Sequence, residues 1–174
     1  ICGNIGNPVM ECISDDVDLY IVELSSYQLD YTNKLDLFAG VITNISPDHL
    51  DRYSSYSNYI SSKLSIYDYS MFNIINLNEP EVNGISGDNF FSIEKNESKC
   101  DFFASKKDNL YEVFHQGKVL MTSDDLLVVG KHNIENMLAS LTLGYRFGLS
   151  VNTMKEAAIE FKGLVHRLEF VSTM

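Results

Sequence analysis

Residues 41–63, VITNISPDHLDRYSSYSNYISSK, decide the fold that this chain is predicted to adopt. The stretch opens on an apolar run, VITNI, that is typical of a buried strand of a parallel sheet. Asp48 and His49 follow the run, and a helix with apolar residues at period 3.6 then places Lys63 near the same edge of the sheet. Because open α/β sheets bind ligands beyond the carboxyl ends of their strands, the stretch predicts a functional site at this edge.

Two interpretations of these polar residues stay open from the stretch alone. In the structural interpretation, Asp48 caps a helix or turn, His49 is a partly buried polar residue, and Lys63 is a surface cation with its stem on apolar neighbours. In the functional interpretation, the three side chains line a ligand site. A lysine held at such a site would not easily stay a hydrated cation.

The other apolar runs predict strands that alternate with helices. The runs LYIV at residues 19–22 and MFNIINL at residues 71–77 are typical of buried strands. Short β-rich runs between residues 90 and 129, with a turn at Gln116-Gly117-Lys118, predict a small antiparallel β-sheet. The predicted fold class is therefore α/β, with a Rossmann-like, mostly parallel sheet flanked by helices and the small antiparallel sheet appended to it.

The composition is that of a globular domain and disfavours several kinds of partner. The chain has 174 residues, 45% of them hydrophobic, which is enough for one domain with a core. The net charge of −11 disfavours binding to nucleic acid, which needs clustered Lys and Arg. No apolar run has the length of a transmembrane helix, so we expect no membrane span and a cytoplasmic location. Three cysteines without CxxC spacing favour neither a disulfide framework nor a zinc site.

A second candidate site follows the predicted strand at residues 19–22. Glu23 would end this strand, and a carboxylate there is costly unless it is paired or bound to a metal. It could form an ion pair with a neighbouring Lys or Arg while Ser25 and Ser26 cap the next helix. Alternatively, Glu23 could bind a metal ion beside serines that bind an anion. The sequence leaves both alternatives open.

A predicted helix that begins near Lys131 and stops at Gly148 carries two asparagines on one face. Asn133 and Asn136 are three residues apart in its first turn, so their amides face the same way. They could contact a nucleotide base or cap the helix. No G-x-x-x-x-G-K-[ST] phosphate-binding loop occurs in the chain.

Six motifs, in this order, resemble the central ATP-binding domain of the Mur ligases. They are GNIG at residues 3–6, ELSSYQL at 23–29, NISPDHLDRY at 44–53, the helix of Lys63, GKHNIEN at 130–136 and HRLE at 166–169. The resemblance covers nearly all of the chain. It implies that residues 1–174 are this central domain, without the phosphate-binding loop, the N-terminal UDP-binding domain and the C-terminal domain. We therefore expect the chain to be a fragment that is inactive by itself.

The resemblance implies an ATP-dependent amide ligase of bacterial peptidoglycan precursor synthesis. The motif ELSSYQL is similar to that of the member that adds D-glutamate to UDP-N-acetylmuramoyl-L-alanine (UDP-MurNAc-L-Ala) through an acyl phosphate. The implied partners are these two substrates and ATP, the implied cofactor is magnesium as two ions, and we expect a monomer. The alternatives are another ligase of the superfamily, such as a folylpolyglutamate synthase, and a non-catalytic ligand-binding domain.

The resemblance also implies catalytic and metal-binding residues. By matched position, Glu23 would bind the magnesium ion shared with the ATP phosphates, and His49 would bind the second ion near the acyl phosphate. Lys63 matches a lysine that the family carries as a carbamate, an anion that can hold or position magnesium. We therefore expect Glu23, His49 and Lys63 to converge on one cleft.

The remaining implied contacts are with ATP and with the acceptor substrate. Asn133 and Asn136 would contact the adenine side of ATP, and Arg167 would contact its ribose or phosphates. The residues implied along the UDP-sugar-peptide substrate are Asn4, Ser25, Ser26 and Gln28.

Overall fold

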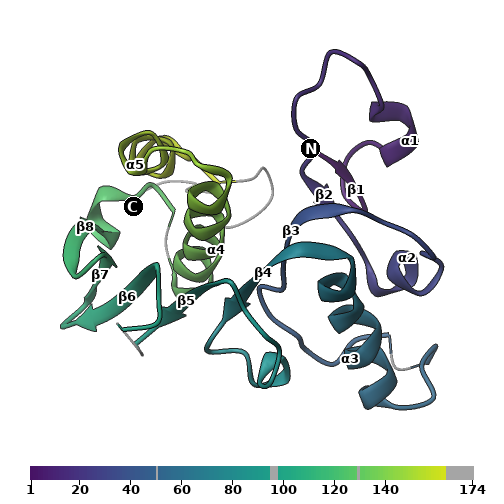
Figure 1. Cartoon of the computed structure of the whole chain (residues 1–174). Helices are drawn as coiled ribbons and strands as arrows, with labels where there is room; N and C mark the ends of the chain where they lie inside the picture. The colour runs from purple at the N-terminus through teal and green to yellow at the C-terminus, as the bar shows by residue number, and fades with distance from the viewer. Residues whose placement is uncertain (50, 95–97, 129, 164–174) are drawn as a thin grey trace, which may run out of the picture.

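The computed structural model describes residues 1–49, 51–94, 98–128 and 130–163. Its main body is a six-stranded sheet with the order β3-β4-β5-β6-β7-β8 (Figure 1). The strands are β3 (Leu37–Val41), β4 (Ser70–Asn76), β5 (Asn89–Ile93), β6 (Phe102–Lys107), β7 (Leu110–His115) and β8 (Lys118–Thr122). The first four are parallel neighbours, and the last two continue the sheet in antiparallel pairing. The predicted α/β fold class is confirmed.

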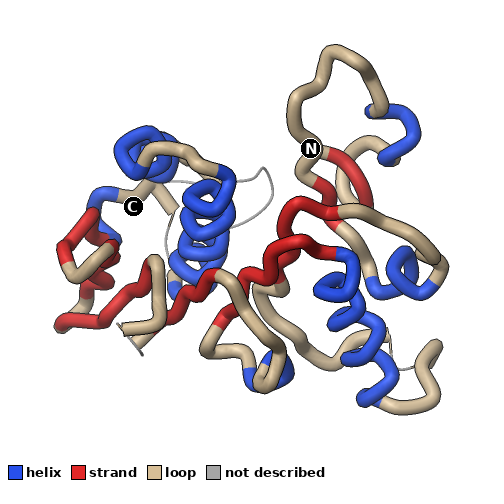
Figure 2. Tube along the Cα trace, viewed as in Figure 1, coloured by secondary structure: helices blue, strands red, loops and turns tan. Residues whose placement is uncertain are grey.

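Helices flank this sheet, as Figure 2 shows in blue. The longer ones are α3 (Tyr56–Leu64), α4 (Lys131–Phe147) and α5 (Val151–Glu160). The short ones are α1 (Val9–Cys12), α2 (Ser26–Asp30), η1 (Ser65–Tyr69), η2 (Pro80–Val82) and η3 (Ser123–Asp125). α4 ends as predicted at Gly148, whose φ of 93° is the left-handed conformation that favours glycine at a helix end. None of the helices within the described ranges has both the length and the apolar character needed to cross a membrane.

Two apolar cores lie on opposite faces of the sheet. Side chains alternate between the faces of a strand, so Ile74 belongs to the core that α4 covers, and Ile75 belongs to the core that α3 covers. In the same way, Phe91 faces α4 and Phe90 faces α3. The sheet is therefore covered on both faces, as a doubly wound fold requires.

The antiparallel strands that the sequence predicts are part of this one sheet. β5 and β6 extend its parallel half, and β7 and β8 form a hairpin at its far end. The predicted turn is confirmed, since Gln116 and Gly117 both have positive φ, 49° and 73°. Two consecutive residues with positive φ give the turn type that matches the twist of a hairpin.

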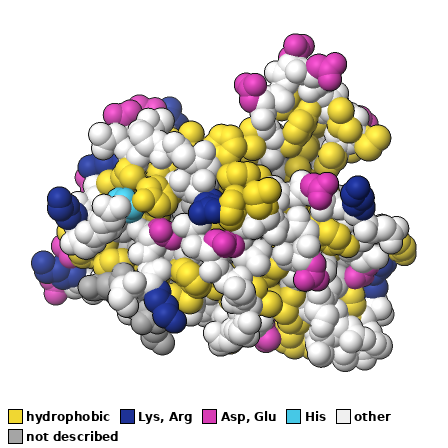
Figure 3. All heavy atoms as spheres, in the orientation of Figure 1, with side chains coloured by type: hydrophobic (Ala, Val, Ile, Leu, Met, Phe, Trp, Pro, Cys, Tyr) yellow, Lys and Arg dark blue, Asp and Glu magenta, His cyan; other side chains and the backbone are white. Residues whose placement is uncertain are grey.

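The predicted central strand at residues 19–22 is wrong. Only Val22–Glu23 is a strand, β2, and it pairs in parallel with β1 (Cys2–Gly3) in a separate two-stranded sheet. Leu19 and Ile21 are 45% and 58% exposed, because within the described chain this segment pairs with β1 alone. Figure 3 shows yellow apolar side chains on the surface of this N-terminal unit, at the upper right.

The strand predicted from the run VITNI begins and ends earlier than expected. It is β3, Leu37–Val41, and it pairs with β4 alone within the described sheet. Position 40, inside this strand, is suited to glycine because a Cβ there would collide with the Ser70 side chain. Ile42 and Ile45 are buried but lie outside the strand. The amide of Ile42 donates to the Tyr67 hydroxyl at 3.2 Å instead of joining a strand ladder.

Candidate functional site

Lys63 lies at the centre of the candidate site, in the last turn of α3. The side chain is half-buried, and burial lowers the pKa of its amine, although the negative charges of Asp48 and Glu23 act in the opposite direction. These two carboxylates come from different segments, since Glu23 ends β2 and Asp48 follows β3. The fold therefore brings three sequence-distant charged groups near one another.

One wall of this site is aromatic. The Lys63 ammonium lies 5.3 Å from the centre of the Tyr59 ring, a distance at which the ring attracts a cation. Tyr59 is buried, and burial together with the charge of Asp48 raises the pKa of its hydroxyl. The phenol therefore stays neutral beside Lys63. The sequence predicted this helix from its apolar period but did not indicate Tyr59 as a neighbour of Lys63.

His49 lies next to Asp48 in an unusual backbone conformation. Its Nε2 is 3.5 Å from Asp48 Oδ2, and its backbone amide donates to Asp48 Oδ1 at 2.8 Å. Its φ is 53°, in the left-handed region that non-glycine residues seldom adopt. Such strained residues persist where the surrounding structure holds them, and they cluster at functional sites.

Tyr27 is packed between His49 and Arg52. The His49 and Tyr27 ring centres are 4.9 Å apart, and the Arg52 guanidinium lies 4.3 Å from the Tyr27 ring centre. The Arg52 amide also donates to the His49 carbonyl oxygen at 3.0 Å. These contacts hold His49 against α2. Sequence reasoning missed both neighbours, because neither lies on an apolar stripe.

A carboxylate of α2 fixes the same Arg52. Asp30 Oδ2 lies 3.6 Å from the Arg52 guanidinium and accepts a hydrogen bond from the Tyr53 hydroxyl at 2.8 Å. Burial raises the pKa of Asp30, but the hydrogen bonds from Ser62 and Tyr53 and the charge of Arg52 outweigh it, so the pKa is lowered overall. This network joins α2 to the segment that follows His49.

The predicted substrate residues at the start of α2 have structural partners. Ser25 caps the helix, since its hydroxyl accepts from the Gln28 amide at 3.3 Å and Gln28 Oε1 accepts from the Ser25 amide at 2.9 Å. Ser26 is buried, and its carbonyl oxygen accepts from the Ser62 hydroxyl at 2.9 Å. Ser25 therefore caps α2, as the structural alternative expected. Substrate contact by Ser25, Ser26 and Gln28 stays a prediction.

Asn4 and Glu23 are neighbours because β1 and β2 pair closely. The Asn4 amide nitrogen donates to the Glu23 carbonyl oxygen at 2.7 Å, and its side chain donates to Glu23 Oε1 at 3.4 Å. Gly3 permits this pairing, since it has φ 119° and a Cβ there would collide with the Glu23 carbonyl. Glu23 itself is exposed, because the strand that it ends is not the buried strand that the sequence predicted.

The predicted ATP residues lie elsewhere on the fold. Asn133 and Asn136 line a pocket of about 440 Å³ between α4 and α5. Most of the other lining side chains are apolar, among them Met137, Leu141 and Met154. Because α4 packs on the opposite face of the sheet from α3, the two asparagines are not part of the group around Lys63. Arg167 lies outside the described residues.

The carboxylates near Lys63 fit part of a magnesium site. Magnesium prefers oxygen ligands and is usually bound through one or two carboxylates, with waters and substrate phosphates as its other ligands. Glu23 and Asp48 offer such oxygens, whereas the His49 imidazole is a ligand better suited to zinc or copper. Within the described ranges, no three or more His, Cys, Asp or Glu side chains gather closely enough to hold a metal. The metal roles of Glu23, His49 and Lys63 stay predictions.

Sequence comparison places the chain in a family. Residues 7–144 match the model of the Mur ligase middle domain. UDP-N-acetylmuramoylalanine–D-glutamate ligases from Coxiella burnetii (strain Dugway 5J108-111) and Marinobacter nauticus are 34% and 35% identical to the chain over 98% and 99% of its length. The chain spans 39% of the length of these two relatives. It belongs to the Mur ligase family.

Two solved structures of ligases have a similar fold. A pseudomurein peptide ligase type C from Methanothermus fervidus matches 77% of this chain and 36% of its own length, with a TM-score of 0.66 and 19% identity. The UDP-N-acetylmuramate-alanine ligase MurC from Thermotoga maritima matches 85% of this chain and 35% of its own length, with a TM-score of 0.63 and 23% identity. At 19% and 23% identity, the two matches show a shared fold alone.

Proposed function

We propose that this chain is the central domain of an ATP-dependent ligase that adds D-glutamate to UDP-MurNAc-L-Ala in bacterial peptidoglycan precursor synthesis. The observation that carries the proposal is the half-buried Lys63 beside Glu23 and Asp48, in a chain of the Mur ligase family. The acceptor is chosen from the D-glutamate ligases that match nearly all of the chain. Such an enzyme uses small soluble substrates, and we propose that it works as a monomer in the cytoplasm.

Lys63 contributes as a carbamate. Carbon dioxide adds to a neutral amine with release of a proton, and burial lowers the pKa of the Lys63 amine toward that neutral form. The product is an anion near Glu23 and Asp48, so three negative groups share the site. Like charges so placed repel one another unless a cation lies among them. A carbamate on Lys63 therefore fits a site that binds magnesium.

The group around Lys63 would bring the ATP phosphates and the alanine carboxylate of the acceptor together. In the proposed reaction, ATP phosphorylates the alanine carboxylate, the amine of D-glutamate attacks the acyl phosphate, and the tetrahedral intermediate expels phosphate. Bound magnesium would supply the positive charge that stabilises the phosphoryl and acyl oxygens. In this proposal Glu23 would hold the ion shared with the ATP phosphates and His49 would hold the second ion. The contacts of His49 with Asp48 and Tyr27 would orient its ring.

The other predicted residues have supporting roles in the same proposal. Asn133 and Asn136 contact the adenine from the pocket between α4 and α5, and Arg167 contacts the ribose or phosphates of ATP. The proposed contacts along the UDP-sugar-peptide substrate come from Asn4, Ser25, Ser26 and Gln28.

Product analysis of the full-length protein tests this function. The protein is incubated with ATP, magnesium and UDP-MurNAc-L-Ala, and phosphate release and product mass are measured with D-glutamate, L-glutamate or L-alanine as the amine. We expect release that depends on D-glutamate and a product enlarged by one glutamyl residue. Turnover with a folate in place of UDP-MurNAc-L-Ala would assign the protein to another ligase of the superfamily. Absence of turnover with every acceptor would overturn the proposal.

A further inference from the structure

Residues 42–45 leave the sheet after β3, yet side chains from other segments hold their backbone. The Ile42 amide donates to the Tyr67 hydroxyl at 3.2 Å. The Thr43 carbonyl oxygen accepts from Asn76 Nδ2 at 2.7 Å, and the Ile45 amide donates to Glu79 Oε2 at 2.7 Å. Each bond replaces one that a strand ladder would otherwise provide.

The three side chains that hold this segment are themselves buried. Tyr67, Asn76 and Glu79 are 6%, 3% and 7% exposed. Tyr67 also donates to the Ile74 carbonyl oxygen at 3.2 Å, and burial raises the pKa of its hydroxyl to about 12, so it remains a neutral donor. A buried polar side chain is costly unless its bonds are made, and these bonds converge on one short segment.

Glu79 does more than cap a helix. Its Oε1 accepts from the Glu81 amide at 3.2 Å, as a cap of η2 does, whereas its Oε2 bonds to Ile45, 34 residues earlier in the chain. A cap of a three-residue helix does not require a buried carboxylate, because an exposed Ser or Asn serves that purpose. The second bond therefore explains the burial of this group.

The held segment leads directly into the candidate site. Asp48 and His49 lie three and four residues after Ile45, and the His49 carbonyl oxygen is fixed on its other side by the Arg52 amide. His49 keeps its left-handed conformation between these two anchors. A shift of residues 42–45 would therefore move Asp48 and His49 relative to Lys63.

We infer that Glu79 and Asn76 are positioning residues of the proposed ligase site. Their hydrogen bonds to Ile45 and Thr43 fix the segment that leads to Asp48, whose charge acts on Lys63, and to the adjacent His49. In this inference they act through the backbone and are assigned no contact with substrate or metal. The inference rests on the proposed function, since it assigns the two residues a part in that reaction. Removal of a group that orients a metal ligand indirectly typically changes metal affinity or activity by roughly 10–100-fold.

The test compares four variants of the full-length protein, at Glu79, Asn76 and Asp101. Glu79→Ala removes the acceptor of the Ile45 amide, and Glu79→Gln keeps an oxygen that can accept the same bond. Asp101→Ala is the matched control, because Asp101 Oδ2 accepts from a backbone amide, that of Phe90, at 3.0 Å, in another part of the sheet. The readouts are the apparent KM for magnesium, kcat, the melting temperature, and hydrogen exchange at the amides of Asp48 and His49.

We expect Glu79→Ala to raise the apparent KM for magnesium or to lower kcat by about tenfold or more. It should also speed exchange at Asp48 and His49. Glu79→Gln should recover most of the turnover at a given magnesium concentration and most of the slow exchange at Asp48 and His49. Asp101→Ala should lower the melting temperature without changing turnover or this exchange. Asn76→Ala, which removes the donor to Thr43, should act in the same direction as Glu79→Ala.

Two results separate the inference from the proposed function. If Glu79→Ala and Asp101→Ala lower the melting temperature alike, and Glu79→Ala changes neither the magnesium dependence nor the exchange at His49, the positioning role is overturned. If the wild-type protein shows no glutamate-dependent turnover, the proposed function fails. The exchange measurement then decides by itself whether Glu79 holds the segment.

Discussion

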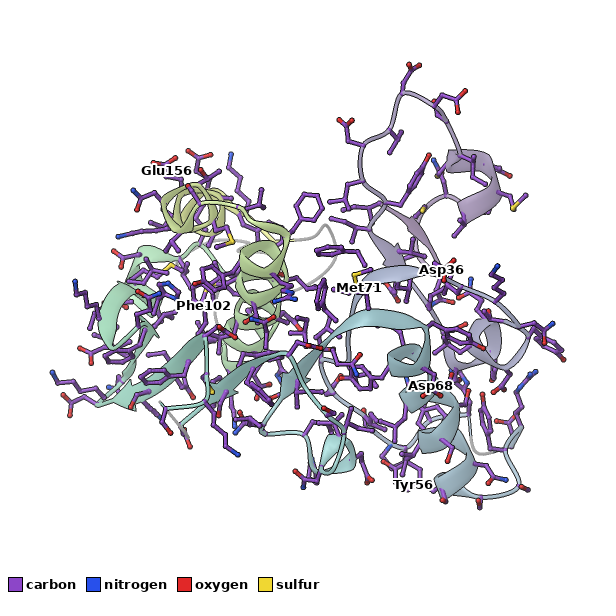
Figure 4. The ribbon with its side chains drawn as sticks, viewed as in Figure 1. Asp36, Tyr56, Asp68, Met71, Phe102 and Glu156 are labelled. Carbon is purple, nitrogen blue, oxygen red and sulfur yellow. The ribbon has the colours of Figure 1, made fainter. Side chains whose placement is uncertain are left out.

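Apolar contacts stabilise the region between the central strands and α4, whereas hydrogen bonds between distant segments stabilise the region around Lys63. Phe91, Ile134 and Leu138, which pack between the sheet and α4, are at most 1% exposed and make apolar contacts. Phe102 lies in the same layer (Figure 4). Around Lys63, by contrast, Ser62 and Glu79 bond to backbone groups of segments more than 30 residues away in sequence.

This difference indicates that apolar packing stabilises the domain, whereas hydrogen bonds position the residues of its site. Apolar packing depends on buried area and has no preferred direction, so it stabilises the sheet without setting the orientation of individual polar groups. Hydrogen bonds have strict distance and angle requirements, so they fix where a backbone segment lies. Substitutions in the first region should therefore change stability most, and those in the second should change stability less and function more.

The largest effect on stability is expected in the apolar region. Phe91→Ala should lower the free energy of unfolding by about 3–5 kcal/mol, because it leaves a cavity beneath α4. Urea unfolding of the chain, followed by circular dichroism, measures the change. The control is Met71→Ala, since Met71 lies on neighbouring β4 but is 70% exposed (Figure 4). A loss below about 0.5 kcal/mol is expected there. Equal losses for the two variants would contradict this account of the core.

A smaller effect is expected at the contact between α2 and α3. Ser62→Ala should cost about 1–2 kcal/mol, because the Ser62 hydroxyl donates to the buried Ser26 carbonyl oxygen at 2.9 Å. Ser61→Ala, one residue earlier on the exposed side of the same helix, should change stability by less than about 0.5 kcal/mol. Urea unfolding of both variants measures this. A Ser61→Ala loss as large as that of Ser62→Ala would show that the hydrogen bond to Ser26 does not set the cost, since helix propensity by itself favours alanine at both positions.

The smallest effect is a pH dependence at Asp30. Because the pKa of Asp30 is lowered in the folded protein, its ionised form stabilises the fold at neutral pH. This stabilisation should be lost as the pH falls below the ordinary Asp value and through the folded-state pKa. The Asp30→Asn variant should therefore be less stable than the wild type at pH 7, by less than about 1 kcal/mol since the group is exposed, and the difference should shrink toward pH 3.

Melting temperatures of the wild type and the variant between pH 3 and pH 7 measure this effect. Asp36→Asn is the control, because Asp36 is an exposed carboxylate of the same region (Figure 4). A difference between wild type and Asp30→Asn that grows toward low pH would contradict the sign of the effect.

The sequence predicted those parts of the fold that depend on local patterns. The run MFNIINL became β4, the turn at Gln116-Gly117 formed a hairpin, and Gly148 ended α4. Each has a signal within a few residues, such as a periodic apolar stripe or a residue suited to positive φ. The strand at residues 19–22 was wrong, because an apolar run carries no information on whether a partner strand lies beside it.

The site was predicted only where strand ends and motifs mark it. Lys63 and Asp48 follow from the rule that ligands bind beyond the ends of strands. Glu79 could not be found in this way, since its bond to Ile45 joins residues 34 apart in sequence and follows no period. Tyr27 and Arg52 were missed for a similar reason. They are distant in sequence, and their contact with each other forms only in the folded chain.

The most direct test of the proposed site is the turnover of Lys63 variants of the full-length protein, measured as D-glutamate-dependent phosphate release. Lys63→Ala should lose at least about 100-fold in rate, which corresponds to about 2.7 kcal/mol, and should recover part of it with added acetate or propionate. These carboxylates can stand in for the carbamate anion. Lys63→Arg keeps a cation but forms no carbamate, so it should remain inactive with or without them. A Lys63→Arg enzyme that turns over near the wild-type rate would show that a cation suffices at this position and would contradict the carbamate site.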